Sequence, residues 1–132
     1  MAHRGYQEKT VLSAAAATGI GTVIDVRDYS TIMLSFASAS SGNLTAKIKG
    51  SIRIREDDVA FGSAYSATNH WTYVESVDAN NGDIVDGDTG FVVAGADASK
   101  TYEANVEGLT FLTVDVIART AGSVTVIAGL FE

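Results

Sequence analysis

Hydrophobic and polar side chains alternate along much of this 132-residue chain, with a period of two. The longest example is residues 44–55, LTAKIKGSIRIR, which places five small or aliphatic side chains on one side, namely Leu44, Ala46, Ile48, Ile52 and Ile54. Such a period is typical of a β-strand that turns one face to a core and the other to solvent or to a partner. We therefore expect a strand here, and Gly50 on its inner face indicates a bulge or a closely packed neighbour.

Other short segments with strand composition follow at regular spacing along the chain. They occupy residues 21–26, 30–38, 70–77, 90–95, 101–106, 109–120 and 124–131. Residues 38–43, SASSGN, are rich in turn formers and are expected to form a loop. Residues 121–123, AGS, are expected to form a tight turn that joins the last two strands into a hairpin.

No window of 11 or more residues has a convincing helical period, and residues 9–19 and 56–68 are only weak helix candidates. Seven to nine short strands without helices are typical of an all-β protein. The sequence therefore predicts a single antiparallel β-sandwich or jelly-roll-like domain at residues 11–132. An extended N-terminal arm, residues 1–10, is expected to precede it.

Composition narrows the classes of function. The formal net charge is −7 and the isoelectric point about 4.6, which argues against nucleic acid as a partner. The chain has no cysteine, which excludes disulfides and thiolate metal sites and fits synthesis in a reducing cytoplasm. No apolar run approaches the roughly 18 residues of a membrane-spanning helix, so no membrane partner is expected.

The acidic stretch DANNGDIVDGDTG, residues 78–90, is the clearest candidate for ion binding, through Asp78, Asp83, Asp86 and Asp88. It departs from the calcium loop of EF-hand proteins, because Gly82 comes one position early and Thr89 stands where the closing glutamate belongs. Asn-Gly and Asp-Gly pairs favour tight turns, and solvated aspartates are poor acid–base catalysts. We therefore expect an exposed turn with no metal or cofactor, and a protein that is not an enzyme.

Four of the nine basic residues lie on the outward side of a single predicted strand: Lys47, Lys49, Arg53 and Arg55. This strip is interpreted either as a docking surface for an acidic partner or as a solvated face with weak ion pairs. The predicted arm adds Arg4 and Tyr6, which could lie over a neighbouring molecule by strand pairing. A frayed terminus is the simpler alternative for the arm.

Trp71 is the only tryptophan and is predicted to anchor the core. An alternative interpretation makes it a stacking group for carbohydrate, together with Tyr73 and Tyr65. That alternative requires an exposed Trp71.

Several segments together resemble a family of small bacteriophage virion proteins. The resemblance is carried by GTVIDVRDYSTIMLS (21–35), GNLTAKIKGSI (42–52), SATNHWTYVESVD (66–78), IVDGDTGFVVAG (84–95), YEANVEGLTFL (102–112) and TAGSVTVIAG (120–129). It covers most of the chain and rests on pattern and spacing rather than on a single motif. The positions that it carries over are structural, namely Trp71, Gly108 and Gly122.

The resemblance implies a non-enzymatic cement or decoration protein on the outer surface of a phage capsid. Its partners would be the major capsid protein and further copies of itself, as a homotrimer or a dimer, since capsids offer both kinds of symmetry axis. A tail or baseplate component is the alternative within the virion, and a carbohydrate-binding β-sandwich is the alternative outside it.

Overall fold

The computed structural model describes residues 6–52, 71–95 and 99–132, and these ranges contain strands and no helix. The strands are β1 (Tyr6–Ala15), β2 (Gly19–Ile20), β3 (Ile24–Asp25), β4 (Thr31–Ser51), β5 (Trp71–Tyr73), β6 (Ser76–Asp78), β7 (Ile84–Val85), β8 (Phe91–Gly95), β9 (Ser99–Asn105) and β10 (Phe111–Phe131). All strand pairs are antiparallel. The all-β prediction is therefore confirmed.

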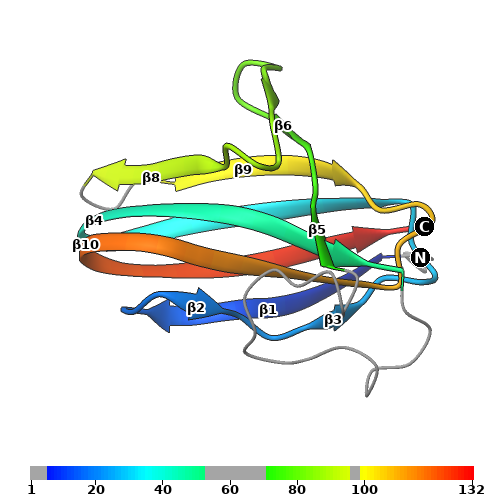
Figure 1. The fold of residues 1–132 in the computed structure, drawn as a ribbon, viewed down its shortest axis with the longest axis horizontal. Coiled ribbons are helices and arrows are strands. Elements are labelled where there is room, and N and C mark those ends of the chain that lie inside the picture. Colours follow the sequence, from blue (N-terminus) through cyan, green and yellow to red (C-terminus); the bar gives the residue numbers. More distant parts are fainter. Residues whose placement is uncertain (1–5, 53–70, 96–98) are drawn as a thin grey trace.

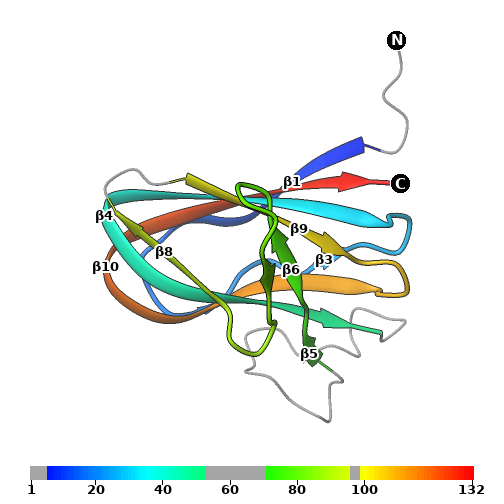
Figure 2. The ribbon, with the colours of Figure 1, turned by 90° about the horizontal axis from the view of Figure 1, so that it is seen from above.

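The strands form one continuous sheet rather than two separate ones. The order along its main path is β1-β10-β4-β9-β6-β7, while β2 and β3 pair with β10, and β5 and β8 pair with β4. Figures 1 and 2 show β4 and β10 running the length of the molecule and turning back together at one end. The sheet consequently folds over on itself, so that its two halves face each other.

The fold-over is made by two 21-residue strands that bend at the same level. In β4, Ser40 and Ser41 have φ angles of 56° and 58°, and opposite them in β10 Gly122 has a φ of 70°. Pairing continues on both sides of the bend, with register shifts between Val116 and Ser123. The bend is thus a pair of facing bulges, which let a strand turn without leaving its partner.

Two sequence predictions are wrong at this bend. Residues 38–43 lie inside β4 rather than in a loop, and residues 121–123 do not close a hairpin. The segments before and after Gly122 both pair with β4, not with each other. The physical reason is that β4 offers a continuous partner, so a glycine with positive φ bends β10 without reversing it.

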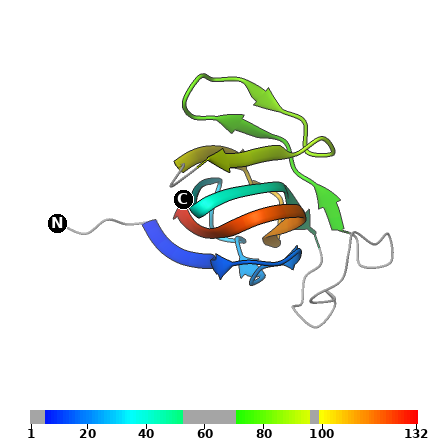
Figure 3. The ribbon, with the colours of Figure 1, turned by 90° about the vertical axis from the view of Figure 1, so that its left-hand side faces the viewer.

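The first half-sheet consists of β1, residues 124–131, residues 31–38, β9, β6 and β7. The second contains β2, β3, residues 111–118, residues 44–51, β5 and β8. In Figure 3, β1 lies at one side of the molecule and β6 at the other.

The main core lies between the two half-sheets. At its centre Phe36 and Tyr102 from the first half-sheet meet Phe91 from the second. The rings of Phe91 and Tyr102 stack with centroids 4.1 Å apart, and Phe36 meets Phe91 edge-on at 4.7 Å. Such ring pairs add to the stabilisation that comes from burying their apolar surface.

The predicted N-terminal arm is partly a strand of the chain's own sheet. Residues 6–10 begin β1 and pair with residues 127–131 of β10. The helix candidate at residues 9–19 is wrong, since β1 extends to Ala15, and the candidate at residues 56–68 lies outside the described residues. As residues 6–10 already have a partner strand on one side, only their other edge is free to pair with another molecule.

Gly122→Ala is expected to destabilise the protein more than Gly82→Ala. Both glycines have positive φ, which disfavours alanine by roughly 1–2 kcal/mol. A Cβ at Gly82 would have open space, whereas one at Gly122 would lie 2.5 Å from the carbonyl oxygen of Ala39 and from Gly42 Cα. Urea unfolding should show an additional loss at Gly122 on the order of 1–3 kcal/mol from that overlap. If Gly122→Ala and Gly82→Ala lowered the free energy of unfolding equally, the result would contradict the close approach of β4 and β10 at the facing bulges.

Candidate functional site

The strip of basic side chains on β4 lies against other groups of the same chain. Lys49 is only 1% exposed, and its Nζ lies 3.0 Å from Asp115 Oδ2 of β10 and 5.7 Å from the centre of the Tyr73 ring. The ion pair lacks the angles of a hydrogen bond, so within the described residues Lys49 Nζ has no hydrogen-bond acceptor. Lys47 Nζ lies 4.4 Å over the Tyr73 ring and 3.5 Å from Asp88 Oδ1.

The prediction that Lys49 faces solvent or a partner is therefore wrong. Strand β5 pairs with the end of β4 and places Tyr73 opposite Lys49, while β10 brings Asp115 from the other side. Lys47 keeps partial access, but its charge is also paired. Arg4, Arg53 and Arg55 lie outside the described residues, and of Tyr6 only the backbone is described, paired with Phe131.

The acidic stretch forms two separate turns. The first joins β6 to β7, where Asp78 Oδ1 accepts the backbone N–H of Asn80 at 2.8 Å and Gly82 has a φ of 80°. The second joins β7 to β8, where Asp86 Oδ1 accepts the N–H of Asp88 at 2.8 Å. Side-chain acceptors of this kind stabilise turns, as the sequence predicted.

The four aspartates considered as candidate calcium ligands are divided between these two turns. Asp78 and Asp83 belong to the first, and Asp86 and Asp88 to the second. In the part of the chain that the structure describes, no three His, Cys, Asp or Glu side chains gather closely enough to hold a metal ion. Calcium needs six to eight oxygen ligands, so these turns would have to rearrange to bind it.

We expect the melting temperature to be the same, within about 1 °C, in millimolar calcium and in chelator, since a ligand stabilises a protein only by binding its folded state. Scanning calorimetry of the same sample under both conditions makes the measurement. Asp83→Asn should leave both values equal, because its carboxylate is not used by a described hydrogen bond. A rise in calcium that Asp83→Asn abolishes would contradict the expectation.

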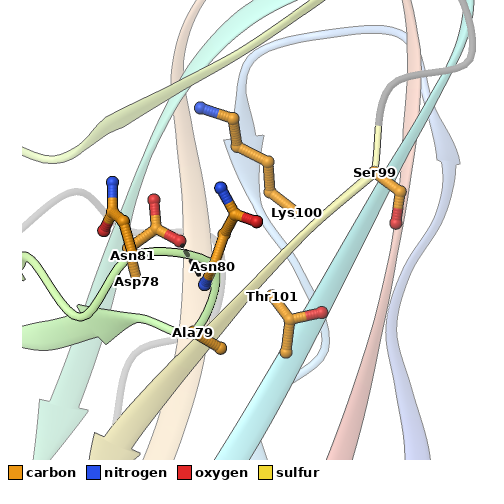
Figure 4. A pocket seen from close by; sticks show the side chains of 7 residues that line it. All are labelled: Asp78, Ala79, Asn80, Asn81, Ser99, Lys100 and Thr101. Carbon is orange, nitrogen blue, oxygen red and sulfur yellow. Dashed lines mark hydrogen bonds between the residues drawn. The ribbon is translucent and has the colours of Figure 1, made fainter.

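An open depression of about 480 Å³ lies beside the first turn. Figure 4 shows its lining, contributed by the turn after β6 and by the start of β9: Asp78, Ala79, Asn80, Asn81, Ser99, Lys100 and Thr101. The backbone N–H of Ala79 donates to the carbonyl of Thr101 at 2.9 Å, which fixes the turn against β9. The lining is polar and has no aromatic side chain.

Three ionisable groups in the described residues, Asp25, Arg27 and Tyr102, have shifted pKa values. Burial, with a smaller contribution from the negative charge of Asp78, raises the pKa of the Tyr102 hydroxyl. Hydrogen bonds from the Arg27 side chain lower the pKa of Asp25, and Arg27 also lies 5.8 Å over the Phe111 ring. The same ion pair raises the pKa of Arg27, so burial accounts for the shift of Tyr102 and mutual pairing for those of Asp25 and Arg27.

Trp71 is buried, with 2% of its surface exposed, and its anchoring role stays a prediction. It packs with Phe111 and Val23 in a small cluster separate from the main core. Its position is incompatible with stacking on a carbohydrate. Tyr73 lies beneath Lys47, and Tyr65 is outside the described residues, so the described part offers no aromatic platform from this set.

The first half-sheet presents a surface that the sequence reasoning missed. Strand pairing aligns one outward row across six strands, in the order Glu8, Gly129, Met33, Glu103, Val77 and Ile84. Adjacent outward rows on either side contribute Thr10, Ile127, Ser35, Thr101, Phe131, Thr31, Asn105, Thr125, Ala37 and Ser99. We call this surface the outer face. Alternation in the sequence identifies its members strand by strand, but only the register brings them together.

No helix in the described ranges is long and apolar enough to cross a membrane. No protein-family model matches the chain, and no curated protein matches it in sequence.

Two solved structures are similar to the chain. The SPBc2 prophage-derived protein YomS has a TM-score of 0.69 and 16% identity, over 96% of this chain and 93% of that one. The PBSX exported protein XepA has a TM-score of 0.68 and 11% identity, over all of this chain but only 39% of XepA. At these identities the likeness concerns the fold. The chain thus has the fold of YomS over nearly its full length, and the fold of one part of XepA.

Proposed function

We propose that the protein is a non-enzymatic component of a bacteriophage particle, acting as a capsid cement or decoration protein. The observation that carries the proposal is the fold, which is shared over almost the whole chain with a prophage-derived protein of similar length. The sequence resemblance to small virion proteins points in the same direction. The fold similarity and the sequence resemblance both concern architecture. The proposed role in the capsid is therefore argued from the mechanical properties of a domain of this kind.

The mechanism would be mechanical. A rigid all-β domain that spans the joint between two capsid subunits adds buried surface to that joint, and the added surface resists internal DNA pressure. Stable docking of this kind buries on the order of 1,000 Å² or more. Many copies on a repeated lattice also allow a modest contact to hold, because linked contacts raise the effective affinity.

The contact between this protein and the major capsid protein, and its assembly as a trimer or dimer, belong to the same proposal. The geometry changes where that contact is expected. Lys49 is internal and Lys47 is paired with Asp88, so the described part of the basic strip has little free charge to offer an acidic partner.

Electron microscopy of virions labelled with a specific antibody tests the proposal. Label distributed over the capsid surface is expected, and particles from a strain lacking the gene serve as the control. Label confined to tails or baseplates would replace this function with the tail alternative. Unlabelled virions from a producing strain would contradict a role in the particle altogether.

A further inference from the structure

We propose that the outer face of the first half-sheet is the docking surface, and that its partner is a protein surface with an apolar centre flanked by two cationic side chains. The inference rests on the proposed function for the identity of that partner, the capsid shell. The choice of face rests only on this chain's residues.

The outer face concentrates exposed apolar surface. Six large hydrophobic side chains are exposed in the described residues, and three of them lie here: Ile84 (68%), Ile127 (37%) and Phe131 (38%). Ile127 and Phe131 belong to β10 and Ile84 to β7, and the partly buried Met33 and Val77 lie on two of the strands between β10 and β7. Exposed apolar side chains gathered on one face of an otherwise charged protein are typical of an interaction site, although Glu103 separates Val77 and Ile84 from Met33.

Charge on the outer face has one sign. Of the residues aligned there, only Glu8 and Glu103 are charged, and within the described ranges neither carboxylate forms an ion pair. Three strand spacings separate them, which places them about 14 Å apart on either side of Gly129 and Met33. A partner with two cations at that separation would complement the face.

The same charges disfavour a second copy of this chain as the occupant. Two outer faces brought together would bury four carboxylates without a cation among the aligned residues, and like charges in contact oppose association. The protein's net charge of −7 adds to that repulsion. The occupant is therefore a different, more basic protein surface.

The size of the outer face suits a repeated contact. The four longer strands, β1, β10, β4 and β9, span roughly 14 Å at the usual spacing and about 20 Å along residues 31–37. Strands β6 and β7 add only three and two residues beyond β9. The area of the four longer strands is about a third of the roughly 800 Å² that each partner contributes to a standard interface, so the contacts of many copies would have to act together. The polar depression at residues 78–81 and 99–101 adjoins it through Thr101 and would form part of the rim.

The experiment measures binding of the purified full-length protein to phage particles that lack it, by co-sedimentation at several concentrations. The charge variant is Glu8→Lys with Glu103→Lys, and its matched control is Glu107→Lys with Asp28→Lys at exposed turn positions. The outer-face pair should weaken binding about tenfold, and more at low salt, because exposed charge pairs are individually weak and are screened. The control pair should bind within about twofold of the unaltered protein.

The apolar contribution has its own matched pair. Ile127→Thr with Ile84→Thr removes exposed apolar surface from the outer face and keeps β-branched side chains in the strands. Val92→Thr with Ile117→Thr makes the same change on the second half-sheet. Only the first pair should reduce particle binding, by about tenfold or more. Circular dichroism melting of each variant confirms that the fold is retained.

The outcomes separate the two proposals. If the unaltered protein does not sediment with particles, the capsid function is overturned, and so is the capsid shell as the partner of the outer face. If it does bind and the outer-face variants bind equally well, the inference about the face is overturned while the function stands. Selective weakening by both outer-face pairs supports the inference.

Discussion

Asp115→Leu should destabilise the protein severely, and adding Lys49→Met should recover most of the loss. Removing Asp115 leaves the Lys49 ammonium buried with no described hydrogen-bond acceptor, and an unpaired buried charge of this kind costs roughly 3–5 kcal/mol. Replacing both partners with apolar residues of similar size removes the charge as well. Such double replacements are often neutral or stabilising.

Urea unfolding followed by circular dichroism measures the free energies of the two single variants and the double variant. Lys47→Met is the control, because its partner Asp88 is exposed and solvated, and it should change stability by about 1 kcal/mol or less. A double variant that is as unstable as Asp115→Leu would show that the pair contributes through shape rather than charge.

Trp71→Ala is expected to lower the free energy of unfolding by roughly 3–5 kcal/mol, through lost burial and the cavity left beside Phe111. Trp71→Phe is the matched control. It keeps an aromatic ring and also removes Nε1, which has no hydrogen-bond partner in the described residues. An unsatisfied buried donor costs about 1–3 kcal/mol, so its removal should offset part of the lost packing.

Because Trp71 is the only tryptophan, unfolding of these variants is followed by circular dichroism rather than by intrinsic fluorescence. A loss below about 1 kcal/mol for Trp71→Ala would contradict its anchoring role, since truncation of a buried aromatic side chain normally costs several times as much.

Alternation predicted which side chains of residues 44–48 enter the core, and Leu44, Ala46 and Ile48 are all buried. The pattern then misled at two places. Ile52 is 65% exposed because β4 ends at Ser51, and Lys49 is buried although it occupies an outward position. An outward side chain becomes internal when another strand places a ring and a carboxylate beside it, and that depends on tertiary pairing that no local pattern contains.

The bend had a local signal that was interpreted wrongly. Gly122 marks a position with positive φ in either a hairpin turn or a bulge. Choosing between them requires knowing that residues 31–51 run alongside as one strand, with SASSGN inside it. The outer face escaped prediction for the same reason, since Glu8 and Glu103 are 95 positions apart in the sequence and come into one row only through the register.

The two bent strands, β4 and β10, also determine how cooperatively the protein unfolds. Each half-sheet contains half of β4 and half of β10, so neither layer is an independent folding unit. We expect unfolding to be all-or-none, with amide hydrogens of both layers exchanging at a common rate set by global opening. Folding should be slow for a chain of this length, because its central pairing joins residues 31–51 to residues 111–131 and that long loop must close first. In the folded protein, the pairing of residues 31–51 with residues 111–131 makes the two half-sheets a single cooperative unit.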